Sequence, residues 1–254
     1  MSASAWRSSA GILLGLLVVS AAVYVLVLRT DRRVLVPISS AILAQPVGDL
    51  PYIPDKPKPD WRVSPSCPPE GLGGDPDLNR LRNRVDKGDY QPVSFESLTA
   101  LTWPKSVERQ PIRDWSPSNR AFISRYLGVP VVVEGYIVYL REGGPDAASC
   151  LQPGNEAPYW RIYFAKNSRD NRVQSVIAES TPQTRIGHTW TIDLIRSFIM
   201  AGRLQVRISG WLYFDPEHAS DAGRTRATLW EISPVMQIEV FQDGKWNPLD
   251  KYGK

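Results

Sequence analysis

Hydrophobic and polar residues alternate most regularly between Val131 and Val240, and this stretch predicts the core of the fold. Within residues 204–213, every second residue is apolar or glycine, and the residues between them are polar or aromatic. That period of two is typical of a β-strand with one buried face. β-branched and aromatic runs predict four more strands, at residues 130–140, 159–165, 173–180 and 227–240.

One helix is predicted between the third and fourth of these strands. Apolar residues recur at three- and four-residue spacing from Trp190 to Ile199, and Gly202 follows as a left-handed cap. Three strands, a helix and two more strands is the order of an OB-type five-stranded barrel. The predicted fold class is therefore mainly β, an OB-like barrel over residues 129–246 followed by a tail at 247–254.

Two residues interrupt the predicted strands. Gly135 lies in the middle of the first strand, which predicts a sharp bend or a close approach of another backbone. Pro234 lies within the last strand and cannot donate to a β-ladder, so we expect a bulge or an edge position there.

Residues 65–128 predict an extended and helical cover for the barrel. Ser94 and the pair Ser116-Pro117 are typical of helix starts. Leu78 and Leu81 stand at helical spacing in another short helix, whose three arginines we expect to be solvated. These arginines are Arg80, Arg82 and Arg84.

The N-terminal part of the chain predicts a membrane anchor. Residues 10–28 carry no charge, and as a helix they would span roughly 28 Å, about the thickness of a bilayer core. A cleaved signal peptide is the alternative, but no small-x-small cleavage site precedes Arg29. We therefore predict an anchor with its flanks at residues 1–33 and a proline-rich linker at 34–64.

The charge distribution leaves the orientation of this anchor open. The formal net charge is +4, but the four arginines and one aspartate beside the apolar segment carry +3 of it. These arginines lie mostly on the C-terminal side, which by the positive-inside rule favours a cytoplasmic domain. The very short N-terminal tail favours the opposite orientation. We expect a single-pass protein of the bacterial cytoplasmic membrane with its C-terminal domain outside.

The two cysteines, Cys67 and Cys150, match no metal-binding spacing. They fit a disulfide if the domain is exported, and two unrelated thiols if it is not. Both interpretations remain open from the sequence.

The strongest candidates for chemistry follow the fourth strand. Asp215, Glu217 and His218, together with Glu231 on the last strand and His188 before the helix, would suit a divalent cation or acid–base catalysis, as in a metal-assisted hydrolase. The alternative is that residues 215–218 form a turn in which Asp215 binds its own backbone, and that His188 belongs to a helix-capping turn. No nucleophile motif or phosphate-binding loop is present. We expect neither a metal nor a cofactor, and we favour a binding protein over an enzyme.

Aromatic and basic residues on the first strands give a second set of candidates. They would form the stacking platform and cationic rim by which OB barrels hold single-stranded nucleic acid. The alternative is that half of the rings fill the barrel. Because the chain beyond the anchor carries only +1, nucleic acid is the less favoured ligand. The set comprises Tyr136, Tyr139, Tyr159, Arg161, Tyr163 and Arg172.

Two stretches, SGWLYFDPEH at 209–218 and RATLWEISPV at 226–235, resemble a group of uncharacterised bacterial proteins with an OB-like C-terminal domain. The motifs are GWL-x-x-DPEH and R-x-T-LWEI-x-PV. Ser233 stands where the group tends to have histidine, which weakens an enzymatic interpretation. The resemblance implies a fold and no activity. We expect a membrane-tethered module that binds a protein, a glycan or a small molecule.

Overall fold

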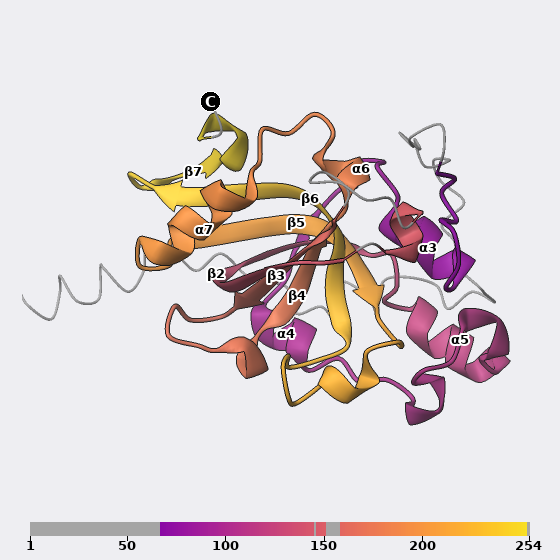
Figure 1. The fold of residues 1–254 in the computed structure, drawn as a ribbon. Coiled ribbons are helices and arrows are strands. Elements are labelled where there is room, and N and C mark those ends of the chain that lie inside the picture. The colour runs from indigo at the N-terminus through magenta and orange to yellow at the C-terminus, as the bar shows by residue number, and fades with distance from the viewer. Residues whose placement is uncertain (1–66, 145, 151–157, 253–254) are drawn as a thin grey trace, which may run out of the picture. The chain divides into compact units, whose positions relative to one another are not determined.

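Five strands close into a barrel in the computed structural model, which describes residues 67–144, 146–150 and 158–252 (Figure 1). The strands pair in the order β2-β3-β4-β6-β5, and β5 pairs again with β2 to close the barrel. The pair β4–β6 is parallel and the other four pairs are antiparallel. The barrel strands are β2 (Pro130–Glu142), β3 (Trp160–Ala165), β4 (Val176–Ser180), β5 (Gln205–Phe214) and β6 (Trp230–Gln242).

The connection between β4 and β5 carries the helices α6 (Pro182–Arg185) and α7 (Ile192–Met200). Three strands, a helical connection and two strands, with the third and fifth strands parallel, is the OB arrangement, so the predicted OB-like fold class is confirmed. Two short strands extend the sheet: β1 (Gln91–Pro92) pairs with β2, and β7 (Lys245–Pro248) pairs with β6.

Between residue 67 and the barrel, the described chain forms three α-helices, and each begins at a capping side chain. The hydroxyl of Ser94 accepts from Ser97 N at 3.1 Å, and that of Ser116 accepts from Asn119 N at 3.2 Å, as predicted. Asp75 caps the first of these helices. The helices are α3 (Pro76–Arg82), α4 (Phe95–Thr99) and α5 (Pro117–Ser124).

Short 3₁₀ segments complete the described chain. They are η1 (Lys105–Val107), η2 (Ile112–Asp114), η3 (Ala147–Ser149), η4 (Arg172–Gln174), η5 (Ala219–Asp221) and η6 (Leu249–Lys251).

Glycines mark the places where barrel strands meet closely. β2 pairs with β5 along its first half and with β3 along its second, and Gly135 lies at this change of partner. A Cβ atom there would approach the carbonyl oxygen of Ala165 to 2.4 Å, so only glycine fits. Gly210 on β5 lies against the irregular part of β6, where a Cβ would meet Pro234 O at 2.5 Å. The pairing of β5 with β6 shifts register around this point, as Pro234 predicted.

The core joins the barrel interior to the preceding helices. Phe214 and Trp230 pack with ring centroids 5.1 Å apart, and both side chains are fully buried. Leu98 of α4 and Ile123 of α5 are also fully buried in the same cluster. The indole of Trp230 donates to the carbonyl oxygen of Thr102 at 3.2 Å. The segment before the barrel therefore contributes to its core.

Two sequence predictions about strand detail were wrong. β4 begins at Val176 rather than at residue 173, because Asn171 and Gln174 form a capping box that turns the chain into η4. β5 is buried on both faces from Ser209 onward, rather than on one. The reason is Trp211 on its outer face, which the guanidinium of Arg84 covers at 3.4 Å from the ring centroid.

The prediction that the arginines of the first helix are solvated was also wrong for two of them. Arg82 and Arg84 are buried, whereas Leu78 and Leu81 pack into the core as expected. Arg84 donates twice to Asp86, and Arg82 donates to the carboxylate of Glu179 on β4.

The predicted anchor at 10–28 and the linker at 34–64 lie outside the described residues. Within residues 67–144, 146–150 and 158–252, no helix has both the length and the hydropathy needed to cross a bilayer.

Candidate functional site

Charged side chains gather at one end of the barrel, and Arg226 lies at their centre. Its guanidinium donates to Asp215 Oδ2 at 2.8 Å and also contacts Glu231 Oε1, so it bridges the end of β5 to β6. All three side chains are buried. Asp215 Oδ1 accepts from the backbone N–H groups of Glu217 and His218 at 3.0 and 3.2 Å, which is the turn that the sequence offered as an alternative. We call this group of side chains the polar-end cluster. Its members are Asp215, Glu217, His218, Arg226 and Glu231, together with Arg82, Asp146, Tyr159, Arg161, Glu179 and Ser233.

The neighbours of His218 determine its tautomer. Nε2 lies 3.1 Å from Arg161 Nη2, and a guanidinium only donates, so Nε2 accepts. Nδ1 lies 2.8 Å from Asp215 Oδ2 and therefore carries the proton that it donates to this carboxylate. Both ring nitrogens are thus committed in this arrangement, in which the imidazole is neutral.

Arg82 of α3 supplies a second cation to the polar-end cluster. It donates to both oxygens of Glu179, at 3.1 and 3.0 Å, and to Asp146 Oδ1 at 3.1 Å. Glu179 Oε2 also accepts from the hydroxyl of Ser233 at 3.2 Å. The side chain of Ser233, which the sequence singled out, therefore lies against a buried carboxylate. The ring of Tyr159 lies beside the arginines of the cluster.

Electrostatic effects within the cluster push the carboxylates in opposite directions. Burial raises the pKa of Glu231 well above its usual range, and the charge of Asp215 adds to the shift. Burial also opposes ionisation of Asp215, but the hydrogen bond from His218 and the charge of Arg226 outweigh it and lower the pKa of Asp215. Burial, followed by the charge of Asp215, raises the pKa of Glu217. Glu231 and Glu217 therefore take up protons before Asp215 does.

The polar-end cluster leaves little free space. It encloses a cavity of about 20 Å³, which is room for about one water molecule. Asp215, Glu217 and His218 each bring one potential ligand atom within 4.8 Å of one another, a spacing that a metal ion would fit. However, both His218 nitrogens and both Asp215 oxygens are already engaged, and two arginines flank the group. The geometry therefore favours a network of ion pairs over a metal or substrate site.

Four of the five predicted chemical residues come together here: Asp215, Glu217, His218 and Glu231. The partners that balance their charge were missed. Arg226 belongs to the second of the resembling motifs, which was the signal available for it. Arg82 and Glu179 are far apart along the chain and only the fold brings them together.

The predicted aromatic platform divides into separate groups. Tyr159 and Arg161 belong to the polar-end cluster. The guanidinium groups of Arg82 and Arg161 lie near the Tyr159 ring, and Arg161 also contacts His218. Tyr139 and Tyr163 meet at 5.2 Å between ring centroids, and the guanidinium of Arg172 lies over both rings. Tyr163 is only 4% exposed and belongs to a small apolar cluster outside the main core. Tyr136 lies where β2 changes partner. The six residues therefore do not form one open face.

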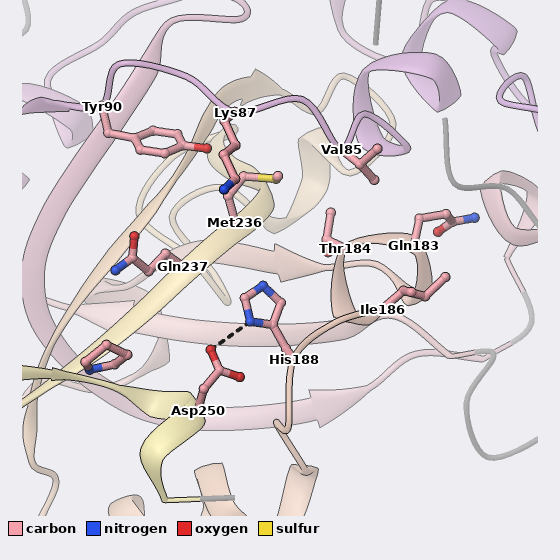
Figure 2. Close-up of a pocket in the computed structure, with 11 residues that line it drawn as sticks. Val85, Lys87, Tyr90, Gln183, Thr184, Ile186, His188, Met236, Gln237 and Asp250 are labelled. Atoms are coloured by element: carbon pink, nitrogen blue, oxygen red, sulfur yellow. Dashed lines mark hydrogen bonds and ion pairs between the residues drawn. The ribbon is translucent and has the colours of Figure 1, made fainter. Parts of the chain in front are cut away.

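His188, the fifth chemical candidate, lies in a separate pocket of about 340 Å³ (Figure 2). Its Nδ1 lies 2.9 Å from Asp250 Oδ2, and its ring stacks on Trp190 at 3.9 Å between centroids. Asp250 Oδ1 accepts from Thr189 N at 2.8 Å. Burial opposes ionisation of Asp250, but the bonds from Thr189 and His188 outweigh it and lower the pKa of Asp250.

This pocket lies between three parts of the chain: the segment after α3, the α6 region and the outer side of β6 with η6. Its polar lining is Lys87, Tyr90, Gln183, Thr184, His188, Gln237 and Asp250, and its apolar lining is Val85, Ile186, Met236 and Pro248. Gln183 is 7% exposed, and its Oε1 has no hydrogen-bond partner among the described residues. Nothing in the sequence placed Gln183 beside a pocket, because the other lining residues come from distant segments.

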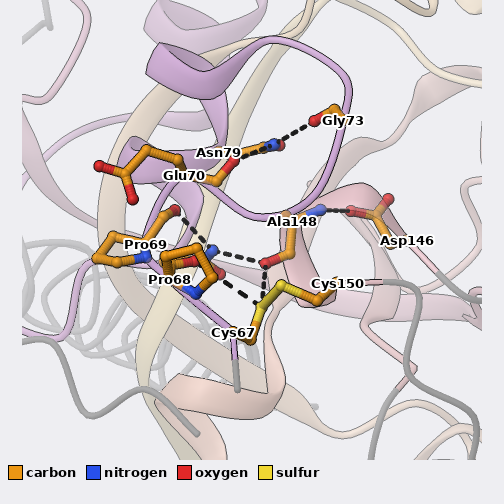
Figure 3. The surroundings of a disulfide bond; sticks show 10 residues. Cys67, Pro68, Pro69, Glu70, Gly73, Asn79, Asp146, Ala148 and Cys150 are labelled. Carbon is orange, nitrogen blue, oxygen red and sulfur yellow. Dashed lines mark hydrogen bonds between the residues drawn. A yellow bond between two sulfur atoms is a disulfide. The ribbon is translucent and has the colours of Figure 1, made fainter. Parts of the chain in front are cut away.

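A disulfide joins Cys67 to Cys150 next to the polar-end cluster (Figure 3). The two Cα atoms lie 5.5 Å apart, and the residues are separated by 83 positions in the sequence. Asn83 strengthens the same junction, since its side-chain amide donates to Pro69 O at 3.0 Å and to Ala148 O at 2.7 Å. The beginning of the described chain is thus attached to η3, the segment beside Asp146.

No protein-family model matches the chain, and no curated protein matches it either. Among solved structures, the chain is similar to a mutant of the Salmonella typhi PltB homopentamer, at 14% sequence identity and a TM-score of 0.27. The alignment covers 46% of this chain and 90% of that one. A similarity at this level carries no functional argument, so the function has to be inferred from the barrel topology and the pocket.

Proposed function

We propose that this chain is a binding protein in which an OB-like barrel takes a small ligand in the pocket beside His188. Residues 10–28 would hold the barrel at the outer face of a bacterial cytoplasmic membrane, and residues 34–64 would act as the spacer. The resemblance of the two sequence motifs to a bacterial group is consistent with this assignment but gives no ligand.

The observation that carries the proposal is the pocket of about 340 Å³, whose lining mixes polar and apolar side chains. Its volume falls within the range of about 300–1,000 Å³ that is typical of small-molecule sites.

The polar-end cluster supports a binding function rather than hydrolysis. A hydrolase needs a substrate beside its acid and base, whereas the cavity here has room for about one water molecule. The groups that would act as acid or base, Asp215 and His218, are engaged by each other and by two arginines.

The disulfide supports placing the domain outside the cytoplasm, since disulfides persist mainly in oxidising compartments. A reporter that is active only outside the cytoplasm, fused after Lys254, tests this orientation. Activity supports the proposal, whereas an inactive reporter together with an active cytoplasmic reporter at the same position contradicts it.

Binding is tested by a small-molecule fragment screen on the full chain in lipid nanodiscs, with saturation-transfer NMR as the readout. We expect hits whose signal is lost in Gln183→Met, which keeps the side-chain length and removes the amide. Gln110→Met is the matched control, because Gln110 is exposed and outside the pocket. Hits that persist equally in both variants, or a screen without hits, would contradict the proposed site.

A further inference from the structure

We infer that Glu179, at the polar end of the barrel, positions the walls of the pocket beside His188, although its side chain lies outside that pocket. The inference rests on the proposed binding function and names a residue that controls the shape of the same site. It follows from the hydrogen bonds of one buried carboxylate and from the short connections that lead from its partners to the pocket lining.

The carboxylate of Glu179 joins three segments that are distant in the sequence. Arg82, at the end of α3, donates to Glu179 Oε2 from Nε at 3.1 Å and to Oε1 from Nη2 at 3.0 Å. Ser233 of β6 donates its hydroxyl to Oε2 at 3.2 Å, and Glu179 itself belongs to β4. We call these three residues the Glu179 triad. All three are buried, so water cannot readily replace a lost partner.

Each of these segments continues directly into one wall of the pocket. The first lining residue comes three or four positions after each member of the Glu179 triad, which is at most about 14 Å along the chain. These lining residues are Val85 after Arg82, Gln183 after Glu179 and Met236 after Ser233. The three parts of the chain that form the pocket are therefore the same three that Glu179 fastens together.

The connections between the triad and the pocket are themselves held in place. In the segment after α3, Arg84 donates twice to Asp86, and both side chains are buried. At the start of α6, the hydroxyl of Thr181 accepts from Thr184 N at 3.4 Å. β6 stays paired with β5 beyond the triad. A displacement at the triad is therefore carried to the pocket walls, because closely packed segments transmit strain.

Methionine methyl groups report on the pocket without any ligand. The chain contains three methionines, Met1, Met200 and Met236, so isotopic labelling of their methyl groups gives few NMR signals. Met236 lines the pocket, whereas Met200 is 86% exposed at the end of α7. Spectra of the full chain in lipid nanodiscs therefore compare the pocket with an unrelated surface, and Met236→Leu assigns the pocket signal.

Two variants test the triad. Ser233→Ala removes the link to β6 and keeps every charge, and Glu179→Gln replaces the carboxylate by a neutral amide. Both should shift the Met236 methyl signal by more than its linewidth and leave the Met200 signal in place. Ser175→Ala is the matched control, because Ser175 is also fully buried, donates one hydrogen bond to a backbone carbonyl at 2.7 Å and lies outside the pocket lining. It should leave both signals unchanged.

Ligand affinity gives a second readout, with the fragments that the screen finds at this pocket as probes. Ser233→Ala should weaken their binding about three- to tenfold, the range that corresponds to one hydrogen bond. Glu179→Gln should weaken it at least about tenfold, because hydrogen bonds to a charged group are lost. Ser175→Ala should leave the affinity unchanged. Circular dichroism and thermal melts of each variant show that it is folded at the measuring temperature.

An unmoved Met236 signal in both triad variants would overturn the inference, and so would an equal shift in Ser175→Ala. If Glu179→Gln does not fold, Ser233→Ala decides alone. Fragments that bind both triad variants as tightly as the wild type would show that Glu179 does not position the pocket, while the binding function stands. A fragment screen without hits would contradict the binding function, whereas the methyl spectra would still test the role of Glu179.

Discussion

Replacing Arg226 by methionine should destabilise the barrel strongly, because this one guanidinium holds two buried carboxylates together. Arg226, Asp215 and Glu231 are 3%, 6% and 4% exposed. Removing one partner of a buried ion pair leaves an uncompensated charge, which typically costs about 3–5 kcal/mol. For a domain of this size, that loss corresponds to a fall in melting temperature of about 6–20 °C.

The assay is urea unfolding of the chain without its first 63 residues, followed by tryptophan fluorescence and repeated as a thermal melt. Arg226→Met should lower the free energy of unfolding by about 3–5 kcal/mol, with an unchanged dependence on urea concentration. Arg113→Met is the control, because this arginine is 74% exposed and its nearest carboxylate is 3.9 Å away. The control should change stability by less than about 0.5 kcal/mol.

A second variant separates charge from packing. In the triple variant Asp215→Asn, Arg226→Met and Glu231→Gln, no ionised group of the trio is left alone, so most of the lost stability should return. The reasoning is refuted if Arg226→Met unfolds within about 1 kcal/mol of the wild type. It is also refuted if the triple variant is no more stable than the single one, since packing rather than charge would then explain the loss.

Three further predictions concern pH and the disulfide. Burial, followed by the charge of Glu179, raises the pKa of Tyr159 to about 12. The contribution of Tyr159 to the free energy of unfolding is therefore full below about pH 10 and is lost as the pH rises toward 12. Tyr159→Phe should remove that loss, roughly 2–3 kcal/mol, and with it the absorbance change of one tyrosinate near pH 12; a titration identical to the wild type would contradict this. The disulfide closes a loop across 83 positions, so Cys67→Ala with Cys150→Ala should lower the free energy of unfolding by about 4–5 kcal/mol on chain-entropy grounds, measured by urea unfolding without reductant; a change below about 1 kcal/mol would count against it. Because the pKa of Asp250 is lowered in the fold, its contribution is present above the unfolded value of about 3.9 and is lost as the pH falls through the folded one. The stability difference between wild type and Asp250→Asn should therefore be constant from about pH 5 to 7 and shrink toward about pH 2.5, and a constant difference over the whole range would contradict the assignment.

The barrel topology was predictable because it depends on local patterns that repeat along the chain. Alternation over residues 204–213 marked β5, and helical spacing before Gly202 marked α7. What failed was detail set by neighbours distant in sequence. The outer face of β5 reads as exposed until Arg84 is known to cover Trp211.

The candidate site was predictable only in part, for the same reason. Asp215, Glu217 and His218 share one turn, and Glu231 is the register partner of Tyr213 on the neighbouring strand, so the topology alone brings these four near each other. Arg82 comes from a helix outside the barrel, and a single sequence carries no signal that links it to Glu179. The pocket beside His188 was missed because its walls come from segments far apart along the chain.

Arg82 also shows which part of the chain must stay together with the barrel when the domain is moved to another protein. The barrel starts at Pro130 by its strands, yet two of its carboxylates, Glu179 and Asp146, have their counter-charge on α3. A gene fusion placed at residue 129 would transfer a barrel in which the buried Glu179 and the partly exposed Asp146 lack their arginine partner on α3. Modules of this kind can therefore be exchanged between proteins only when the chain from Cys67 onward moves with the barrel.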